Sequence, residues 1–278
     1  MKKIFGWIML LGAAVGQAAT IDMRQAPDDV LESIVYWADF ESEEPEVNDL
    51  GLGLIPYLEE GVTRIGSDEG YRIRWRDGLW NHPVCKSGAY TLSFDVHELK
   101  GETGHALMSL YTAGGSRENG LIFKVGKRGT LELVCNGFSN ATKHARRNKI
   151  SLGKMSELAQ GKTITIVYDG DQKTICAYVN GKRLEKTIKL KYAGATPEKD
   201  IHSMQFGGYY GASHAVRRAK LDNVCIWNEA LTDEQVASIV EGYISPVVFW
   251  SLVSAGGVLL LAGGCFVVYR CKSGRAKA

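Results

Sequence analysis

Aromatic and basic side chains gather in one segment of the sequence, GGYYGASHAVRR at residues 207–218. Its adjacent tyrosines could stack on a sugar ring or pack against a peptide, because an aromatic ring combines a broad apolar face with a polar tip. Its histidine and arginines could bind acidic groups, since a guanidinium group donates several hydrogen bonds in a fixed planar fork. Two tryptophans from an earlier loop could extend the same surface. The candidate ligand-binding residues are Tyr209, Tyr210, His214, Arg217, Arg218, Trp75 and Trp80. The competing interpretation is that one tyrosine belongs to the core and the arginines are simply solvated.

The first residues of the chain are typical of a secretory signal peptide. A short basic start, MKK, precedes the mostly apolar residues 4–15. Gly16 and Ala18 then supply small residues before a cleavage site, as such signals do. Residues 1–18 are therefore predicted to be a signal peptide cleaved after Ala18, with an uncleaved anchor as the alternative.

The other end of the chain is typical of a membrane anchor. Residues 246–269 carry no charge, and as a helix they would be about 36 Å long, enough to cross a hydrocarbon core of about 30 Å. Basic residues follow at once, and such residues stay in the cytoplasm. The sequence thus predicts an exported domain at 19–245, a transmembrane helix at 246–269 and a basic cytoplasmic tail at 270–278. The domain would lie outside the cytoplasm, at a bacterial cell surface or in the periplasm.

Charge is unevenly distributed along the chain. There are 33 lysines and arginines against 31 aspartates and glutamates, but six of the basic residues lie in the two end segments. The predicted exported domain therefore has 27 basic and 31 acidic residues, a net charge of −4. An acidic domain argues against nucleic acid as a partner.

Four of the six cysteines lie in the predicted exported domain, namely Cys85, Cys135, Cys176 and Cys225. An even number of cysteines outside the cytosol suggests disulfides, and no C-x-x-C pair suggests zinc. Of the three possible pairings we favour Cys135–Cys176, which would tie strands of a central meander, and Cys85–Cys225, which would pin the entry to an early strand onto the last strand. Buried free thiols are the alternative.

Between its ends the sequence consists of short strand-like segments separated by turns. Apolar and polar side chains alternate in them, as in YTLSFDV at 90–96, which is the period of a β-strand. Asn180-Gly181 is the strongest turn signal, because both residues tolerate the positive φ of a tight hairpin. This pattern predicts a β-sandwich or jelly roll. The predicted strands span residues 34–40, 62–65, 71–75, 90–96, 106–111, 121–125, 130–135, 163–169, 174–179 and 203–208.

Residues 221–240, LDNVCIWNEALTDEQVASIV, predict a last strand followed by a short helix. Side chains alternate through the first part of this segment. Thr232 can then cap a helix, and Gln235 completes a capping box. Leu231 and Val236 fit a hydrophobic staple around the same start.

Taken in order, these segments resemble the laminin-G-like, concanavalin A-like family of jelly rolls. The resemblance covers about residues 33–242 and rests on IVYWADF, YTLSFDV, TITIVYD, SMQFGG and the closing strand and helix. It implies an all-β, concanavalin A-like β-sandwich with a short C-terminal capped helix, followed in this chain by one transmembrane helix. It also implies ligand binding, since these folds mostly bind and only sometimes cut.

Glycosidases of this fold carry two catalytic glutamates in an E-x-D-x-x-E arrangement, which places both carboxylates on one side of a cleft. The sequence has no such run, and the segment at 94–98 offers only Asp95 and Glu98. The motifs G-x-S-x-G and H-E-x-x-H are missing too, and the six histidines are scattered singly. The sequence therefore favours a protein without catalytic activity.

Calcium is the cofactor that the resemblance implies, because domains of this family often hold one ion at the rim through carboxylates and carbonyls. Asp222 matches the family's aspartate at the start of the last strand, which makes it the candidate metal ligand. In the competing interpretation its carboxylate is structural and accepts backbone amides that pin a neighbouring loop.

The predicted function is recognition of a ligand by a membrane-anchored protein of the cell envelope. Its partners would be a glycan or an envelope or extracellular protein, and the membrane through its own span. One alternative is a structural or adhesin subunit that docks on a partner protein. The other is a divergent glycoside hydrolase or lyase.

Overall fold

In a computed structural model of the chain, the structure describes residues 21–23, 26–41, 44–49, 58–59, 62–66, 73–76, 89–112, 120–136, 149–189, 201–207 and 214–240. No helix within these ranges is long and apolar enough to cross a bilayer. The predicted signal peptide, the predicted span at 246–269 and the predicted tail lie outside them and stay predictions.

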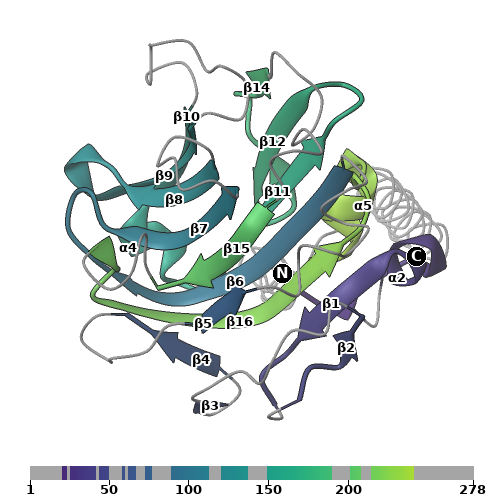
Figure 1. Cartoon of the computed structure of the whole chain (residues 1–278), viewed down its shortest axis with the longest axis horizontal. Coiled ribbons are helices and arrows are strands. Elements are labelled where there is room, and N and C mark those ends of the chain that lie inside the picture. The colour runs from purple at the N-terminus through teal and green to yellow at the C-terminus, as the bar shows by residue number, and fades with distance from the viewer. Residues whose placement is uncertain are drawn as a thin grey trace, which may run out of the picture. The chain divides into compact units, whose positions relative to one another are not determined.

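The described strands form two antiparallel sheets (Figure 1). The first sheet runs in the order β13-β12-β11-β6-β16-β1-β2, with β14 paired to β12, β4 to β16 and β3 to β4. The last strand, β16, is thus inserted between β6 and β1 in the middle of the sheet. The bounds in chain order are β1 Ile34–Ala38, β2 Val47–Asn48, β3 Leu58–Glu59, β4 Val62–Ile65, β6 Ala89–Lys100, β11 Lys162–Asp169, β12 Thr174–Val179, β13 Lys182–Arg183, β14 Ile188–Lys189 and β16 Arg218–Trp227.

The second sheet has the order β10-β9-β8-β7-β15-β5. Its strands are β5 Ile73–Arg76, β7 Ala106–Thr112, β8 Gly120–Val125, β9 Thr130–Asn136, β10 Lys149–Lys154 and β15 Ile201–Phe206. Figure 1 shows β7, β8 and β9 facing the long strands β6 and β11 of the first sheet. A turn of 3-10 helix at Lys127–Gly129 connects β8 to β9. The short helix α4, Met155–Leu158, connects β10 of the second sheet to β11 of the first.

The core lies between the two sheets. On β6 the alternate residues Leu92, Phe94 and Val96 are buried in it, as the period of a strand requires. The ring of Phe94 meets the rings of Phe123 and Phe206 from the second sheet edge to face, at centroid distances of 5.4 and 5.7 Å. Such aromatic contacts join the two layers. The predicted all-β sandwich is therefore confirmed.

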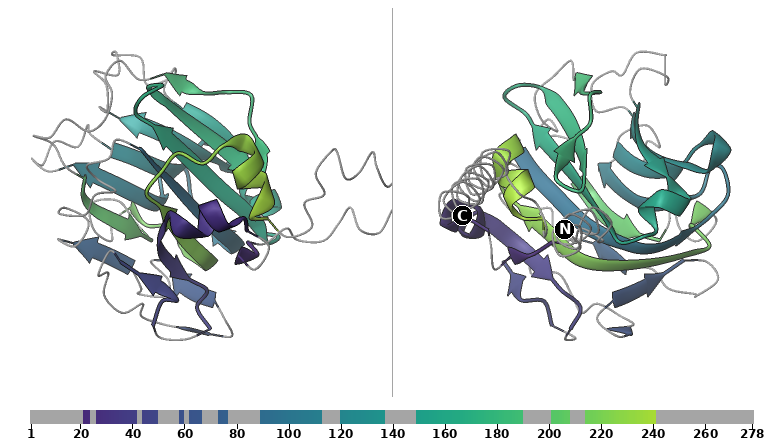
Figure 2. Two further views of the ribbon diagram at one scale, coloured as in Figure 1. Left: turned by 90° about the vertical axis from the view of Figure 1, so that its right-hand side faces the viewer. Right: turned by 180° about the vertical axis from the view of Figure 1, so that it is seen from behind.

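A third layer covers part of the outer face of the first sheet. It consists of the helices α2, Asp28–Glu32, and α5, Asp233–Ser238, which lie side by side (Figure 2), together with residues 21–23. Trp227 is fully buried beneath it and donates its indole N–H to the carbonyl of Val30 at 3.0 Å. This layer gives the first sheet a second, smaller apolar cluster on its outer side.

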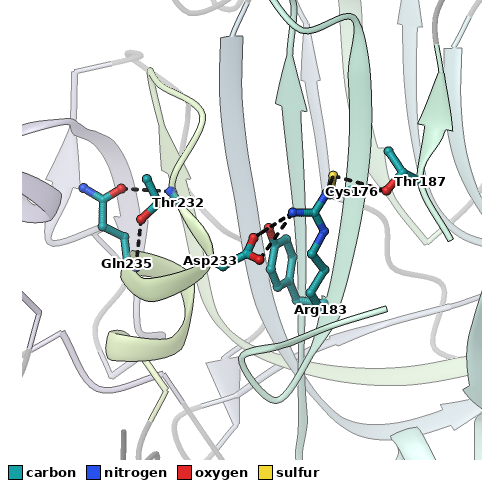
Figure 3. Close-up of polar contacts among 7 residues, drawn as sticks. Cys176, Arg183, Thr187, Thr232, Asp233 and Gln235 are labelled. Carbon is teal, nitrogen blue, oxygen red and sulfur yellow. Dashed lines mark hydrogen bonds and ion pairs between the residues drawn. The ribbon is translucent and has the colours of Figure 1, made fainter. Parts of the chain in front are cut away.

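The predicted capped helix is confirmed as α5 (Figure 3). The hydroxyl of Thr232 accepts the N–H of Gln235 at 3.2 Å, and the Gln235 side chain accepts the N–H of Thr232 at 2.9 Å. The predicted hairpin is confirmed as well, since Asn180 and Gly181 have φ of 52° and 70° between β12 and β13. Strand ends differ by a few residues, and the short strands β2, β3, β13 and β14, as well as β10, were not predicted.

The favoured disulfides are wrong. Cys135 lies in the core between the sheets, whereas Cys176 lies on the outer face of the first sheet. The two side chains therefore point into different layers, and the thiol of Cys176 is free. Cys225 is also a buried free thiol, so the pairing with Cys85, which lies outside the described residues, is not formed either.

Candidate functional site

The predicted ligand-binding residues are only partly brought together by the structure. His214 and Arg217 are exposed just before β16, and Arg218 is its first residue. Trp75 instead lies on β5 in the second sheet, opposite Met204 in the ladder. Three further predicted residues lie outside the described part of the chain, namely Trp80, Tyr209 and Tyr210.

The backbone around Arg217 is held from several sides. Its N–H donates to the carbonyl of Lys100 at 2.8 Å, and the N–H of the preceding Val216 donates to the carbonyl of Ala106 at 3.0 Å. Gly66 packs against the same segment, because a Cβ at that position would lie 2.3 Å from the carbonyl oxygen of Arg217. The close approach explains why this position is a glycine. The backbone at Arg217 is therefore held in place by hydrogen bonds and close packing.

Charged side chains surround this segment on the outer face of the first sheet. Arg217 forms an ion pair with Glu102 in the turn after β6. The Nζ of Lys100 lies 2.8 Å from an Oε1 of Glu98, and a guanidinium nitrogen of Arg218 lies 3.9 Å from the same oxygen. The hydrogen bond from Lys100 lowers the pKa of Glu98, and nearby positive charges add to the effect.

We call this group the cationic rim. It comprises Lys100, Arg217, Arg218 and Lys220, with Glu98 and Glu102. Lys220 belongs to it because it lies opposite Glu98 in the ladder. Four basic and two acidic residues give the rim a net charge of +2, in a predicted exported domain of net charge −4. A local excess of positive charge attracts anions.

A second polar cluster lies further along the same two strands, where two β-bulges interrupt the pairing of β6 with β16. Asp95 and Asp222 lie directly opposite each other between the bulges. His97 is the extra residue of the first bulge. Asn223, with φ of 48°, lies at the second. Bulges of this kind re-aim side chains and are frequent beside functional sites.

Asp95 is the fully buried member of this cluster. One carboxylate oxygen accepts the hydroxyl of Thr163 at 2.5 Å. The other accepts the N–H of Ile21 and the side-chain amide of Asn223, each at 3.0 Å. Burial raises the pKa of Asp95 to about 6, although the three hydrogen bonds act in the opposite direction. The carboxylate thus joins three segments of chain that are far apart in sequence.

Asp222 is only partly exposed, and its oxygens face the protein. One accepts the N–H of Asn223 at 2.7 Å. The other lies 3.6 Å from Nε2 of His97 and raises the pKa of that imidazole. Among the described residues, no three side chains of His, Cys, Asp or Glu are grouped so that they could hold a metal ion. The hydrogen bond that Asp222 accepts from the N–H of Asn223 is the kind of contact that the structural interpretation expects, and a calcium ion at Asp222 stays a prediction.

A third cluster ties α5 to the first sheet (Figure 3). Asp233 accepts the hydroxyl of Tyr178 at 2.6 Å and the guanidinium of Arg183 at 3.0 and 3.3 Å. The same guanidinium reaches Sγ of Cys176 at 3.0 Å. Burial and the bond to Asp233 raise the pKa of Tyr178, so the phenol stays protonated. These contacts hold the start of α5 against β12 and β13.

Sequence reasoning missed Lys100, Glu102 and Lys220 of the rim, and it did not pair Asp95 with Asp222. Alternation along residues 89–100 could have shown that Asp95 and Glu98 share a strand with Lys100. That strand pairs with β16, and the paired residues Asp95 and Asp222 are 127 positions apart in the sequence. No local signal predicts such a pairing. Only the sheet order brings Glu98 beside Lys220.

Comparison with known proteins agrees with this architecture. A sequence model described as the concanavalin A-like lectin/glucanases superfamily matches residues 74–237. No curated protein sequence matches the chain. A sialidase of Trypanosoma rangeli in complex with 2,3-difluorosialic acid has a similar fold, with a TM-score of 0.55 and 14% identity over 88% of this chain and 40% of that chain.

Two neurotoxin structures are similar to a comparable degree. The binding domain of botulinum neurotoxin DC in complex with SialylT has a TM-score of 0.50 and 12% identity over 75% of this chain and 51% of that chain. A structure of botulinum neurotoxin type C, whose cell entry depends on two ganglioside molecules, has a TM-score of 0.50 and 11% identity at the same coverage. The chain spans about half the length of these neurotoxin chains. At such identities the likeness concerns the fold alone.

Proposed function

Because this chain belongs to the concanavalin A-like lectin/glucanases superfamily, we propose that it is a non-catalytic binding protein that recognises a carbohydrate. Its β-sandwich would be displayed outside the cytoplasm by the predicted span at 246–269. The signal-peptide pattern of residues 1–18 supports that placement. The fold does not by itself assign a ligand, so the argument depends on the side chains.

One observation favours binding over hydrolysis, namely that the carboxylate of Asp95 is buried and hydrogen-bonded within the protein. A glycosidase needs two carboxyl groups that reach the scissile bond from opposite or adjacent sides. Asp95 and Asp222 are the pair that the ladder between β6 and β16 places opposite each other. Asp95 is fully buried, and both of its oxygens accept hydrogen bonds from the protein. A substrate therefore has no access to that carboxylate, which supports a binding role.

The surface around residues 207–218 is the proposed ligand site. Its described part exposes His214 and Arg217 beside the positive charges of the rim. Tyr209 and Tyr210 are close in sequence and would add the aromatic surface on which sugar rings stack. Proteins of similar fold have been solved with a sialic acid derivative and with SialylT, which makes carbohydrates the first ligand class to test.

A glycan array tests this function. The purified full chain in mild detergent is applied at low and at physiological salt, because contacts between exposed charges weaken as salt rises. We expect a subset of glycans to be bound at both salt concentrations. The double variant Tyr209→Ala/Tyr210→Ala should lose most of that signal. The variant Lys154→Ala, at an exposed residue on another strand, should keep it.

Two outcomes would count against the proposal. Silence of the array at both salt concentrations would overturn carbohydrate recognition and favour the alternative of a protein ligand. Unchanged binding by the double tyrosine variant would leave carbohydrate recognition standing but would remove this loop as the site.

A further inference from the structure

The cationic rim already holds two carboxylates, and both belong to the protein itself. Glu98 lies among Lys100, Arg218 and Lys220, and Glu102 is paired with Arg217. We propose that the rim is the subsite for a carboxylate-bearing sugar, and that Glu102 occupies Arg217 as an internal stand-in until such a ligand arrives. This inference rests on the proposed carbohydrate recognition and assigns it a ligand class.

The pair of Arg217 and Glu102 is easy to exchange. Both side chains are more than half exposed, at 55% and 61%. Exposed ion pairs contribute little to stability, because water and salt screen them and two long side chains must be ordered. A ligand carboxylate can therefore replace Glu102 at a small energetic cost. The planar guanidinium suits this exchange, since it binds any carboxylate through the same pair of N–H groups.

The Arg217 backbone is in place before any ligand binds. The hydrogen bond to Lys100 and the close packing of Gly66 hold it against β6 and β4. Preorganisation of this kind favours binding, because less conformational freedom is lost when the ligand arrives. The rim also has a local charge of +2 in an acidic domain, so it attracts anionic ligands.

Glu98 and Glu102 differ in how readily each could release its basic partner. Glu98 is about one-fifth exposed and bonded by Lys100 at 2.8 Å, and the positive charges around it lower its pKa. It therefore stays ionised and keeps its cations in position. Glu102 projects from the turn after β6 and has the greater exposure. This contrast assigns the exchange to Glu102 and a positioning role to Glu98.

Binding of defined sugars to the full chain in detergent tests the inference. The probes are oligogalacturonate, its methyl ester, which keeps the sugar and removes the charge, and a heparin oligosaccharide, which offers sulfates. We expect oligogalacturonate to bind more tightly than its methyl ester. Glu102→Gln should raise its affinity about two- to fivefold, since the competing ion pair is weakened. Arg217→Ala should lower it about tenfold or more.

Controls separate this effect from a general change of charge. Arg217→Lys keeps the charge but loses the planar fork, so its affinity should lie between those of the wild type and Arg217→Ala. Glu157 on α4 forms another exposed ion pair, with Lys154 on β10. Glu157→Gln removes the acid of that pair and should leave the affinity for oligogalacturonate unchanged. Circular dichroism of each variant confirms that the sheets are intact.

The possible failures are distinguishable. Equal binding of oligogalacturonate and its methyl ester, unaffected by Arg217→Ala, would overturn the inference and leave carbohydrate recognition standing. Preference for the heparin oligosaccharide over oligogalacturonate would overturn the assignment to carboxylates. Binding to none of the three probes, with a silent glycan array, would overturn the proposed function and this inference together.

Discussion

Asp95 sets a pH dependence that can be measured at the level of one residue. Burial raises the pKa of its carboxyl to about 6 from an ordinary value of 3.8. The folded protein therefore keeps this proton at pH values where the unfolded chain has already lost it. Stability consequently falls as pH rises from about 4 to about 6, by about 3 kcal/mol at most. His97 acts in the same direction, because its pKa is raised by Asp222 and its contribution is lost as pH rises through that pKa.

The variant Asp95→Asn isolates this contribution. An amide at this position can still accept the N–H groups of Ile21 and Asn223 through its oxygen and can donate to the hydroxyl of Thr163. We expect its free energy of unfolding to change less between about pH 4 and pH 7 than that of the wild type, as followed by urea denaturation. Glu157→Gln, which alters an exposed carboxyl, should reproduce the wild-type profile. A wild type that is equally stable across this range would contradict the raised pKa.

At the scale of elements, Gly66 decides how β4 meets the start of β16. Its φ is +140°, and an added Cβ would lie 2.3 Å from the carbonyl oxygen of Arg217 and 2.9 Å from Cα of Arg218. Both contacts are to backbone, so a side chain cannot be accommodated by a rotamer change. We expect Gly66→Ala to reduce the free energy of unfolding by about 1–3 kcal/mol and to displace the rim.

A second glycine supplies the matched control for this prediction. Gly104 has φ of +98°, yet the nearest atom to an added Cβ is Cε of Lys124, at 3.9 Å. Gly104→Ala therefore carries the cost of positive φ without the clash. Denaturation curves of both variants separate the two effects, and equal destabilisation would show that the contact with Arg217 is unimportant.

The same scale shows why parts of the fold were predictable. The capping box at Thr232 and the hairpin at Asn180-Gly181 depend on residues within a few positions of each other, so sequence alone identifies them. The position of β16 between β6 and β1 depends on contacts between distant segments. That order decides which side chains face Asp95 and Glu98, and it has no local signal. The disulfide prediction failed for the same reason, because spacing does not tell which layer a cysteine enters.

At the scale of the whole domain, its first and last described segments are joined. Ile21 pairs with Val240 in an isolated bridge, and the N–H of Asp22 donates to the carbonyl of Ile239 at 2.9 Å. Ile21 is also bonded to Asp95 in the first sheet. The first and last described residues of the domain therefore lie side by side.

The predicted span at 246–269 leads to a prediction about membrane attachment. If the apolar residues 246–269 span a bilayer, the full chain should stay in the membrane pellet during extraction with alkaline carbonate. A variant that ends after Ser245 should be released, because it keeps every described element up to Val240 and loses only the anchor and the basic tail. N-terminal sequencing of the membrane-bound form should begin at Ala19, as cleavage after Ala18 requires.

Replacement of several residues of 246–269 by leucine serves as the control, since an apolar helix of the same length should still anchor the protein. Release of the full chain by carbonate would contradict the anchor, and an intact Met1 on the membrane form would show that the amino-terminal segment is retained as a second anchor.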